Sequence, residues 1–400
     1  MHGSASFADL LVLLVVVLAV AIGSRHSRVP YTVGLVLAGL VIGLIPGHPT
    51  VALTPDLVMV VFLPALLFAG AWTYPQDELR RNWVPIALLA TLGVLICMLA
   101  SWFVLVRFAG LSAPIALIFG AIVSATDPVA VISVFRSLRI DPRLGAIVEG
   151  ESLFNDATAV VAFKVTLVMS IAATQASAAQ PFVDFLELLA GGTLVGLAVG
   201  CAGLFVLRFT DDYMIEAMGT LIVAYGSYYI ADSLRVSGLI AVIVAGMLVS
   251  RVGTRMGSFT TTRAAVNQLW EFIAFVANSI LFVLVGLSID LRATYANLAI
   301  IAWAIVAVVV ARVIAVYGLS ALSGLLGQRL PARWQHVFFL GGLRGALSMA
   351  LVLSLPASFP DRGLLVSMVF AVVLFTIIVQ GLALAPAIFR LRLQHQPSPR

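Results

Sequence analysis

The sequence contains very few charged residues for its length. Only 10% of its 400 residues are charged, whereas 62% are hydrophobic and the mean hydropathy is +1.12. A soluble globular protein is about 25% charged and about 45–50% apolar. No soluble core buries so much apolar surface, which excludes a soluble domain carried on a single anchor. The composition predicts a chain that lies in lipid along most of its length.

Cysteine and lysine are also scarce. Cys97 and Cys201 both fall inside apolar runs, which favours packing roles over a disulfide, and Lys164 is the single lysine. The chain is basic, with 23 Lys and Arg against 18 Asp and Glu, but most charges lie in short gaps between apolar runs. This distribution excludes nucleic acid as a partner. The first run, from Phe7 to Ser24, has no basic segment before it and no clear cleavage site, so we expect a retained span.

Long apolar runs are what the sequence has in abundance. A helix that spans the membrane needs about 20 apolar residues. We therefore expect an all-α polytopic membrane protein with about 13 transmembrane helices. The runs cover residues 7–24, 30–46, 55–72, 84–106, 113–135, 143–174, 182–207, 213–232, 236–250, 265–289, 294–323, 334–356 and 363–390.

Basic residues concentrate in every second connection between these runs. Sixteen arginines lie in or beside those connections, and only four lie in the intervening ones. Cytoplasmic loops carry the excess of Lys and Arg in membrane proteins. We expect a multi-pass protein of the cell membrane with its N-terminus outside and its C-terminus in the cytoplasm.

The fifth run carries an aspartate at the depth of the bilayer, where charged side chains are costly and usually functional. Asp127 lies in the stretch SATDPVAV. Pro128 cannot donate a backbone hydrogen bond and disfavours helix at the residue before it, so we expect a helix break around Thr126 and Asp127. Unwound backbone at this depth lines a cavity or is buried in protein.

The sixth run contains an unusual density of polar residues within the stretch EGESLFNDATAVV. Ser152 and Asp156 are four residues apart and share one helix face, with Glu151 and Asn155 on the neighbouring stripe. Together with Asp127 and the carbonyl groups freed at the break, these side chains offer oxygen ligands, which hard cations prefer. The sequence therefore predicts a site for a monovalent cation between the fifth and sixth spans.

The twelfth run is interrupted by glycines. Gly341, Gly342 and Gly345 surround Arg344. A pair of interrupted spans at matching positions in the two halves of a chain indicates a transporter built from inverted repeats. A buried arginine needs an acidic partner, and we expect Arg344 to form a structural ion pair with Glu151.

These stretches resemble the NhaP/NHE branch of the monovalent cation–proton antiporters, within the Na⁺/H⁺ exchanger family. The resemblance implies an NhaA-like antiporter fold with two discontinuous, crossing helices, and a homodimer. It implies a scaffold of residues 1–80 and 182–290, a core of residues 84–180 and 294–392, and a short cytoplasmic tail of residues 393–400. The matching segments, in family order, are ATDPVAV (125–131), GESLFNDATAVV (150–161), WEFIAFVANSILFVLVGL (270–287) and GGLRGALSMAL (341–351).

The resemblance also implies roles within the site. Asp156 would carry the cation and the proton in turn, with Thr126, Asp127, Ser152 and Asn155 around it. No resident cofactor is implied, because Na⁺ and H⁺ are the transported substrates. One departure concerns the third run, where many relatives carry an acid. This chain instead has Phe68 and Ala69 within LLFAGAW (66–72), so no third carboxylate is expected there.

The expected function is exchange of Na⁺ for H⁺ by alternating access. One carboxylate suffices if the two substrates compete for it, because a bare negative charge at mid-membrane is too costly to move. Asn155 before Asp156 indicates, by resemblance, an electrically silent exchange. The sequence does not separate Na⁺ from Li⁺ or K⁺, so a K⁺/H⁺ antiporter stays an alternative.

The sequence disfavours two other functions of membrane proteins. An intramembrane aspartyl protease is disfavoured because Asp127 and Asp156 stand in the contexts Ala-Thr-Asp-Pro and Asn-Asp. A potassium channel is disfavoured because the only stretch that resembles an ion-selectivity filter is followed by Leu35.

Lys164 lies eight residues beyond Asp156, about 12 Å along a helix. It either extends to the outer interface or borders an outward-facing cavity.

Overall fold

The computed structural model describes residues 7–26, 31–45, 57–172, 180–209, 212–255, 262–288, 295, 297–356 and 358–393. Within these ranges the chain is helical and contains no β-strand. Lipid offers no hydrogen-bond partners to the backbone, and a helix satisfies its own N–H and C=O groups. This is why the apolar runs fold as helices, and the all-α prediction is confirmed.

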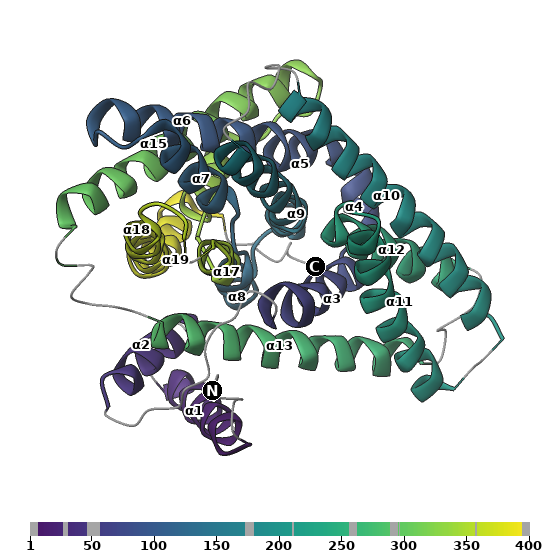
Figure 1. Cartoon of the computed structure of the whole chain (residues 1–400). Helices are drawn as coiled ribbons and strands as arrows, with labels where there is room; N and C mark the ends of the chain where they lie inside the picture. Colours follow the sequence, from purple (N-terminus) through teal and green to yellow (C-terminus); the bar gives the residue numbers. More distant parts are fainter. Residues whose placement is uncertain are drawn as a thin grey trace.

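One group of helices comes from two separate parts of the chain. Figure 1 shows α13 running across the lower part of the view, with α1 and α2 near one end and α10 to α12 near the other. Here α2 and α3 pack against α13, α3 packs against α12, and α10 packs against α12. The bounds are α1 (Phe7–His26), α2 (Tyr31–Gly43), η1 (Leu57–Phe62), α3 (Leu63–Thr73), α10 (Gln180–Leu207), α11 (Tyr213–Ser233), α12 (Gly238–Arg255) and α13 (Arg263–Leu287).

The second group contains the two interrupted helices. Here α6 packs against α7 and α15, α9 packs against α5 and α7, and α18 packs against α15 and α17. The bounds are α4 (Gln76–Arg81), α5 (Trp83–Ala90), α6 (Leu92–Phe108), α7 (Ala113–Ser124), α8 (Val129–Leu138), α9 (Pro142–Ala172), α15 (Leu298–Leu325), α16 (Ala332–Leu340), α17 (Ala346–Leu353), α18 (Arg362–Phe375), η2 (Thr376–Gln380) and α19 (Gly381–Leu391). The division into scaffold and core domains stays a prediction.

Close packing between α10 and α12 depends on small residues. A Cβ added at Gly192 or at Gly196 would lie 2.5 Å from a backbone carbonyl oxygen of the facing segment, at Ser237 or Ala241. Real Cβ atoms do not approach so closely, so only glycine fits at these positions. Small residues at such spacing let membrane helices approach one another closely.

Both predicted helix breaks are present. α7 ends at Ser124 and α8 begins at Val129, while α16 ends at Leu340 and α17 begins at Ala346. The two unwound segments meet, because the backbone N–H of Asp127 donates to the carbonyl oxygen of Leu343 at 2.8 Å. Each segment thus satisfies part of the other's backbone at a depth where water is scarce.

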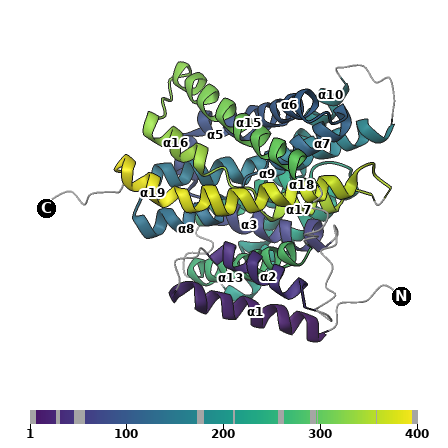
Figure 2. The ribbon, with the colours of Figure 1, turned by 90° about the vertical axis from the view of Figure 1, so that its left-hand side faces the viewer.

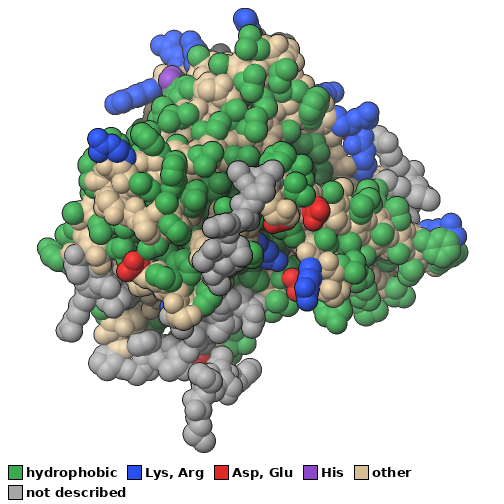
Figure 3. All heavy atoms as spheres, turned by 45° about the horizontal axis from the view of Figure 1, so that its top comes forward, with side chains coloured by type: hydrophobic (Ala, Val, Ile, Leu, Met, Phe, Trp, Pro, Cys, Tyr) green, Lys and Arg blue, Asp and Glu red, His purple; other side chains and the backbone are tan. Residues whose placement is uncertain are grey.

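The predicted apolar runs all overlap helices of the described part of the chain. Seven of those helices are long and apolar enough to cross a membrane, and four shorter apolar helices accompany them. The number of thirteen spans therefore stays a prediction. α1 begins and α19 ends at opposite ends of the bundle (Figure 2). Hydrophobic side chains cover most of the face in Figure 3, as expected for a surface in contact with lipid.

Candidate functional site

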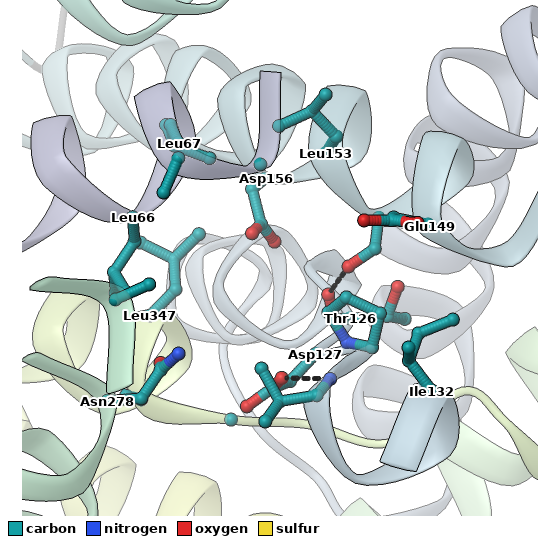
Figure 4. A pocket seen from close by; sticks show the side chains of 18 of the residues that line it. Leu66, Leu67, Thr126, Asp127, Ile132, Glu149, Leu153, Asp156, Asn278 and Leu347 are labelled. Carbon is teal, nitrogen blue, oxygen red and sulfur yellow. Dashed lines mark hydrogen bonds between the residues drawn. The ribbon is translucent and has the colours of Figure 1, made fainter. Parts of the chain in front are cut away.

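A cavity of about 480 Å³ lies beside the meeting point of the unwound segments. Side chains of α3, α9, α13 and α17 line it together with the segment between α7 and α8. Four of the five predicted cation-site residues belong to the lining: Thr126, Asp127, Ser152 and Asp156. Figure 4 shows the side chains of Asp127 and Asp156 directed toward the same space.

The break in the first interrupted helix positions Asp127. One carboxylate oxygen, Oδ1, accepts a hydrogen bond of 2.9 Å from the backbone N–H of Val129, the first residue of α8. The other side of the carboxylate lies against Gly345, where an added Cβ would overlap Asp127 Oδ2. Asp127 is therefore held between a helix N-terminus and a glycine of the second interrupted helix.

The unwound segment is held from α9 by two side chains. Ser152 Oγ donates a hydrogen bond to the carbonyl oxygen of Thr126, and Asn155 Nδ2 donates to Thr126 Oγ1 at 2.7 Å. The backbone N–H of Thr126 in turn donates to Asn155 Oδ1 at 3.4 Å. The sequence predicts Asn155 as a ligand, but in the structure its amide engages Thr126 on both sides and does not line the cavity. Its position is that of a residue that fixes the break.

Asp156 differs from these residues because its carboxylate has no partner within the part of the chain that the structure describes. Within the described residues it accepts no hydrogen bond and lies in no ion pair, although it sits inside α9 and faces the cavity (Figure 4). An ionised carboxylate without compensation is costly at this depth. The arrangement leaves Asp156 free to bind a proton or a cation from the cavity.

The prediction that Glu151 pairs with Arg344 is wrong. Glu151 forms a two-pronged ion pair with Arg312 of α15, through Nη1 to Oε1 and through Nη2 to Oε2 at 3.3 Å. Arg312 Nη2 also donates to the carbonyl oxygen of Phe338 at 2.8 Å. Arg344 lies in the unwound segment, where its Nη1 donates to the carbonyl oxygen of Gly342 at 3.1 Å. Among the described residues, no carboxylate lies within ion-pair distance of Arg344.

The Arg312 side chain occupies space that a glycine leaves open. Arg312 passes directly over Gly342, where an added Cβ would lie 2.5 Å from its Nε. The glycines of the second break therefore serve two neighbours, since Gly342 makes room for Arg312 and Gly345 makes room for Asp127. Arg312 and Arg344 are only 5% and 1% exposed, so both positive charges are buried beside the crossing.

Lys164 lies outside the cavity lining. Its Nζ is 3.7 Å from Asp232 Oδ1 on α11, and both side chains are about half exposed, at 47% and 56%. A pair so exposed contributes little to stability. A role for Lys164 at an outward-facing cavity stays a prediction.

Polar residues outside the predicted site also line the cavity. Arg136 and Glu149 stand near the adjoining ends of α8 and α9, and Glu271 and Asn278 belong to α13. Figure 4 shows Asn278 facing the space that Asp127 and Asp156 face. The seven-residue spacing of Glu271 and Asn278, which returns to the same helix face, is the signal that could have placed them together.

The third predicted run contributes no acid to this cavity. Ala69 of α3 belongs to the lining, whereas Phe68 is fully buried and packs against Trp270 with ring centroids 4.5 Å apart. The wall formed by α3 offers Leu63, Leu66, Leu67, Ala69, Gly70 and Thr73. The carboxylates of the cavity therefore come from other elements.

Comparison with known proteins identifies the family. Residues 11–390 match the family described as sodium/hydrogen exchanger, transmembrane. The chain belongs to the sodium/hydrogen exchanger family. This confirms the resemblance inferred from the sequence, and it places this exchanger among transporters embedded in the membrane, not among enzymes.

Individual relatives match this exchanger over nearly its whole length. It is 40% identical to the Na(+)/H(+) antiporter ApNhaP of Aphanothece halophytica, over 96% of this chain and 74% of that protein. It is 37% identical to the Na(+)/H(+) antiporter NhaH of Halobacillus aidingensis, over 98% of this chain and 100% of that protein. The solved structure of the sodium proton antiporter MjNhaP1 from Methanocaldococcus jannaschii shares its fold, with a TM-score of 0.77 and 24% identity over 96% of this chain and 99% of that one.

Proposed function

We propose that this exchanger moves Na⁺ and H⁺ in opposite directions, with both ions competing for the Asp156 carboxylate. The observation that carries the proposal is the position of that carboxylate. It faces a cavity from within a membrane helix and has no partner among the described residues. Ionised Asp156 binds Na⁺, and protonated Asp156 does not, so one site serves both substrates.

Several oxygen atoms around Asp156 are suited to a partly dehydrated Na⁺. Hard cations take carboxylate, hydroxyl and carbonyl ligands. Asp127 uses Oδ1 for the N-terminus of α8 and has Oδ2 available, while Ser152 Oγ keeps lone pairs when it donates to Thr126. We assign these three side chains to the cation, and we assign Asn155 to the support of the break.

The buried charges around the crossing favour an exchange of one cation for one proton. Asp127, Asp156 and Glu151 carry three negative charges when ionised, and Arg312 and Arg344 carry two positive charges. The empty set therefore has a net charge of −1, and one Na⁺ or one H⁺ brings it to zero. A neutral set moves through the membrane at much lower cost than a charged one. Only the loaded protein would then change conformation, and neither direction would move charge.

The cavity is proposed to open to the cytoplasm in this structure. Its lining includes Thr73 at the end of α3, Arg136 near the end of α8, and Glu149 and Glu271 in the first halves of α9 and α13. These positions share one side of the bundle, which the distribution of arginines predicts to be cytoplasmic. Transport then requires the core helices to shift against the scaffold helices.

We also propose that the protein forms a homodimer in the cell membrane. The surface of α10 presents large apolar side chains, such as Leu194, Phe205 and Val206 at 67%, 57% and 65% exposure. Such a surface suits either lipid or a second copy of the chain. The N-terminus is proposed to lie outside and the C-terminus in the cytoplasm.

The decisive experiment replaces Asp156 by Asn in proteoliposomes that contain a pH-sensitive dye. Asp156→Asn should insert normally but show no cation-dependent proton flux, and Asp127→Asn should lose most of it. Asp184→Asn serves as the control, because Asp184 is outside the cavity and accepts a hydrogen bond from the nearby Gln180. Proton flux retained by Asp156→Asn would refute the assignment. The same assay with Na⁺, Li⁺ and K⁺ in turn tests the alternative of a K⁺/H⁺ antiporter.

A further inference from the structure

A second cavity of about 410 Å³ lies on the surface between α16 and α19. Figure 2 shows these two helices at the end of the bundle where α19 ends, and they pack against each other. The cavity is an open groove, and ion exchange at Asp156 makes no use of it. Its lining residues are His336 and Leu340 of α16 with Ala383, Pro386, Ala387, Arg390 and Leu391 of α19.

The groove is basic toward the end of the bundle and apolar toward its middle. Arg390 is next to the last residue of α19, and Ala383 lies seven residues earlier, about 10 Å deeper along the helix. On α16, His336 is nearer the start of the helix and Leu340 lies four residues deeper, about 6 Å. A ligand that fills the groove must therefore combine an anionic end with an apolar body.

Several arginines at this end of the bundle have no carboxylate partner among the described residues. Arg333, Arg390 and Arg392 make no ion pair within the part of the chain that the structure describes. Figure 3 shows basic side chains beside a histidine at the upper left of that view. The resulting positive potential attracts mobile anions. By the distribution of arginines, this end of the bundle faces the cytoplasm.

His336 is held in a fixed orientation at the basic end. Its Nδ1 lies 2.7 Å from the hydroxyl oxygen of Tyr317, and the two rings meet edge to face with centroids 5.8 Å apart. When the tyrosine hydroxyl donates to Nδ1, the Nε2 atom carries a proton and is a hydrogen-bond donor. No described residue accepts from Nε2. In that tautomer the groove has an oriented donor in addition to the Arg390 guanidinium.

We propose that the groove between α16 and α19 binds an anionic phospholipid, with its phosphate on Arg390 and His336 and an acyl chain along Leu340 and Ala383. Arginine binds phosphate strongly because its parallel N–H groups match two phosphate oxygens. Basic pockets between membrane helices on the cytoplasmic side bind anionic headgroups. A lipid fits better than free phosphate because only a lipid covers the apolar part of the groove.

The surroundings of the groove place it in contact with the bilayer. Leu382 and Phe389 of α19 are 49% and 53% exposed, as expected for side chains that face lipid. A lipid seated there would bridge two helices that pack against each other. α16 leads directly into the unwound segment whose Leu343 carbonyl oxygen accepts from Asp127. Binding would therefore stabilise the part of the protein that supports the crossing.

The test measures the melting temperature of the detergent-purified full chain with added lipid. Phosphatidylglycerol should raise the melting temperature by several degrees, whereas phosphatidylcholine and inorganic phosphate should leave it unchanged. Arg390→Gln should lose most of the increase. The matched control is Arg80→Gln on α4, an exposed arginine on the same predicted side that also lacks an ion partner among the described residues.

A second variant separates a built groove from general surface charge. Ala383→Phe keeps every arginine but fills the apolar part, so it should also lose the increase, and native mass spectrometry should count fewer bound phosphatidylglycerol molecules. An equal response to phosphatidylcholine or to inorganic phosphate would overturn the proposal. So would an unchanged response to phosphatidylglycerol in both Arg390→Gln and Ala383→Phe.

Discussion

Two arginines are buried beside the crossing, but among the described residues only Arg312 forms an ion pair with a carboxylate. Arg312 contacts both oxygens of Glu151 and the carbonyl oxygen of Phe338, whereas Arg344 donates from its guanidinium to Gly342. Removing one partner of a buried ion pair leaves the other charge uncompensated. That loss is usually about 3–5 kcal/mol, more than the pair gains over an apolar replacement.

We therefore expect Arg312→Met to lower the free energy of unfolding by about 3–5 kcal/mol. The measurement is the melting temperature of the purified protein, followed by tryptophan fluorescence. The double variant Arg312→Met with Glu151→Leu should recover much of the loss, because no buried charge is left unpaired. Arg344→Met is the comparison, and it should cost less than Arg312→Met. A larger loss for Arg344→Met would restore the pairing expected from the sequence.

At the residue scale, the sequence was sufficient to group four residues that line one cavity, but not to find the ion partner of Glu151. Polar groups at membrane depth are costly and usually functional, and this is how the sequence pointed to Thr126, Asp127, Ser152 and Asp156. All four line one cavity. Sequence gives the depth of a residue but not its lateral neighbours. For that reason the choice between two buried arginines for Glu151 depended on the packing of α15 near α9.

At the element scale, the two breaks are prepared by different residues. Pro128 ends helical hydrogen bonding in the first, and glycines open the second. The sequence predicted both breaks from these residues. The sequence could not predict that the backbone N–H of Asp127 donates to the carbonyl oxygen of Leu343, or that the Asp127 carboxylate lies against Gly345. These contacts join segments more than 200 residues apart.

The contact between the breaks predicts a strong effect of Gly345→Ala. The added Cβ would overlap the Asp127 carboxylate and displace it from the cavity. Displacement of a functional group by about 1 Å can reduce a rate roughly 100-fold. We expect a comparable loss of Na⁺-dependent proton flux in proteoliposomes, with normal insertion. Gly381→Ala is the control, since its nearest atoms would be 3.8 Å from the new Cβ. Equal flux in the two variants would show that Asp127 tolerates displacement.

At the scale of the whole molecule, the arginines in the sequence predict which ends of the helices share a side. The structure places the start of α1 and the end of α19 at opposite ends of the bundle. The balance of buried charge emerges only when the helices are assembled. Glu151 and Asp156 lie five residues apart on α9, yet Glu151 pairs with Arg312 of α15 and Asp156 shares its cavity with Asp127 of the unwound segment. The proposed neutrality of the loaded site depends on this assembly.

That neutrality predicts exchange that is insensitive to voltage. Moving one elementary charge across a potential of 100 mV changes its free energy by about 2.3 kcal/mol. Proteoliposomes given an imposed potential of either sign should therefore show unchanged Na⁺-dependent proton flux if one Na⁺ is exchanged for one H⁺. Arg344→Gln would leave the loaded site with a net charge of −1 in both directions. Its turnover should then change with the imposed potential although the net exchange stays neutral. Flux of the unaltered protein that is driven by voltage would contradict the one-to-one exchange, whatever Arg344→Gln does.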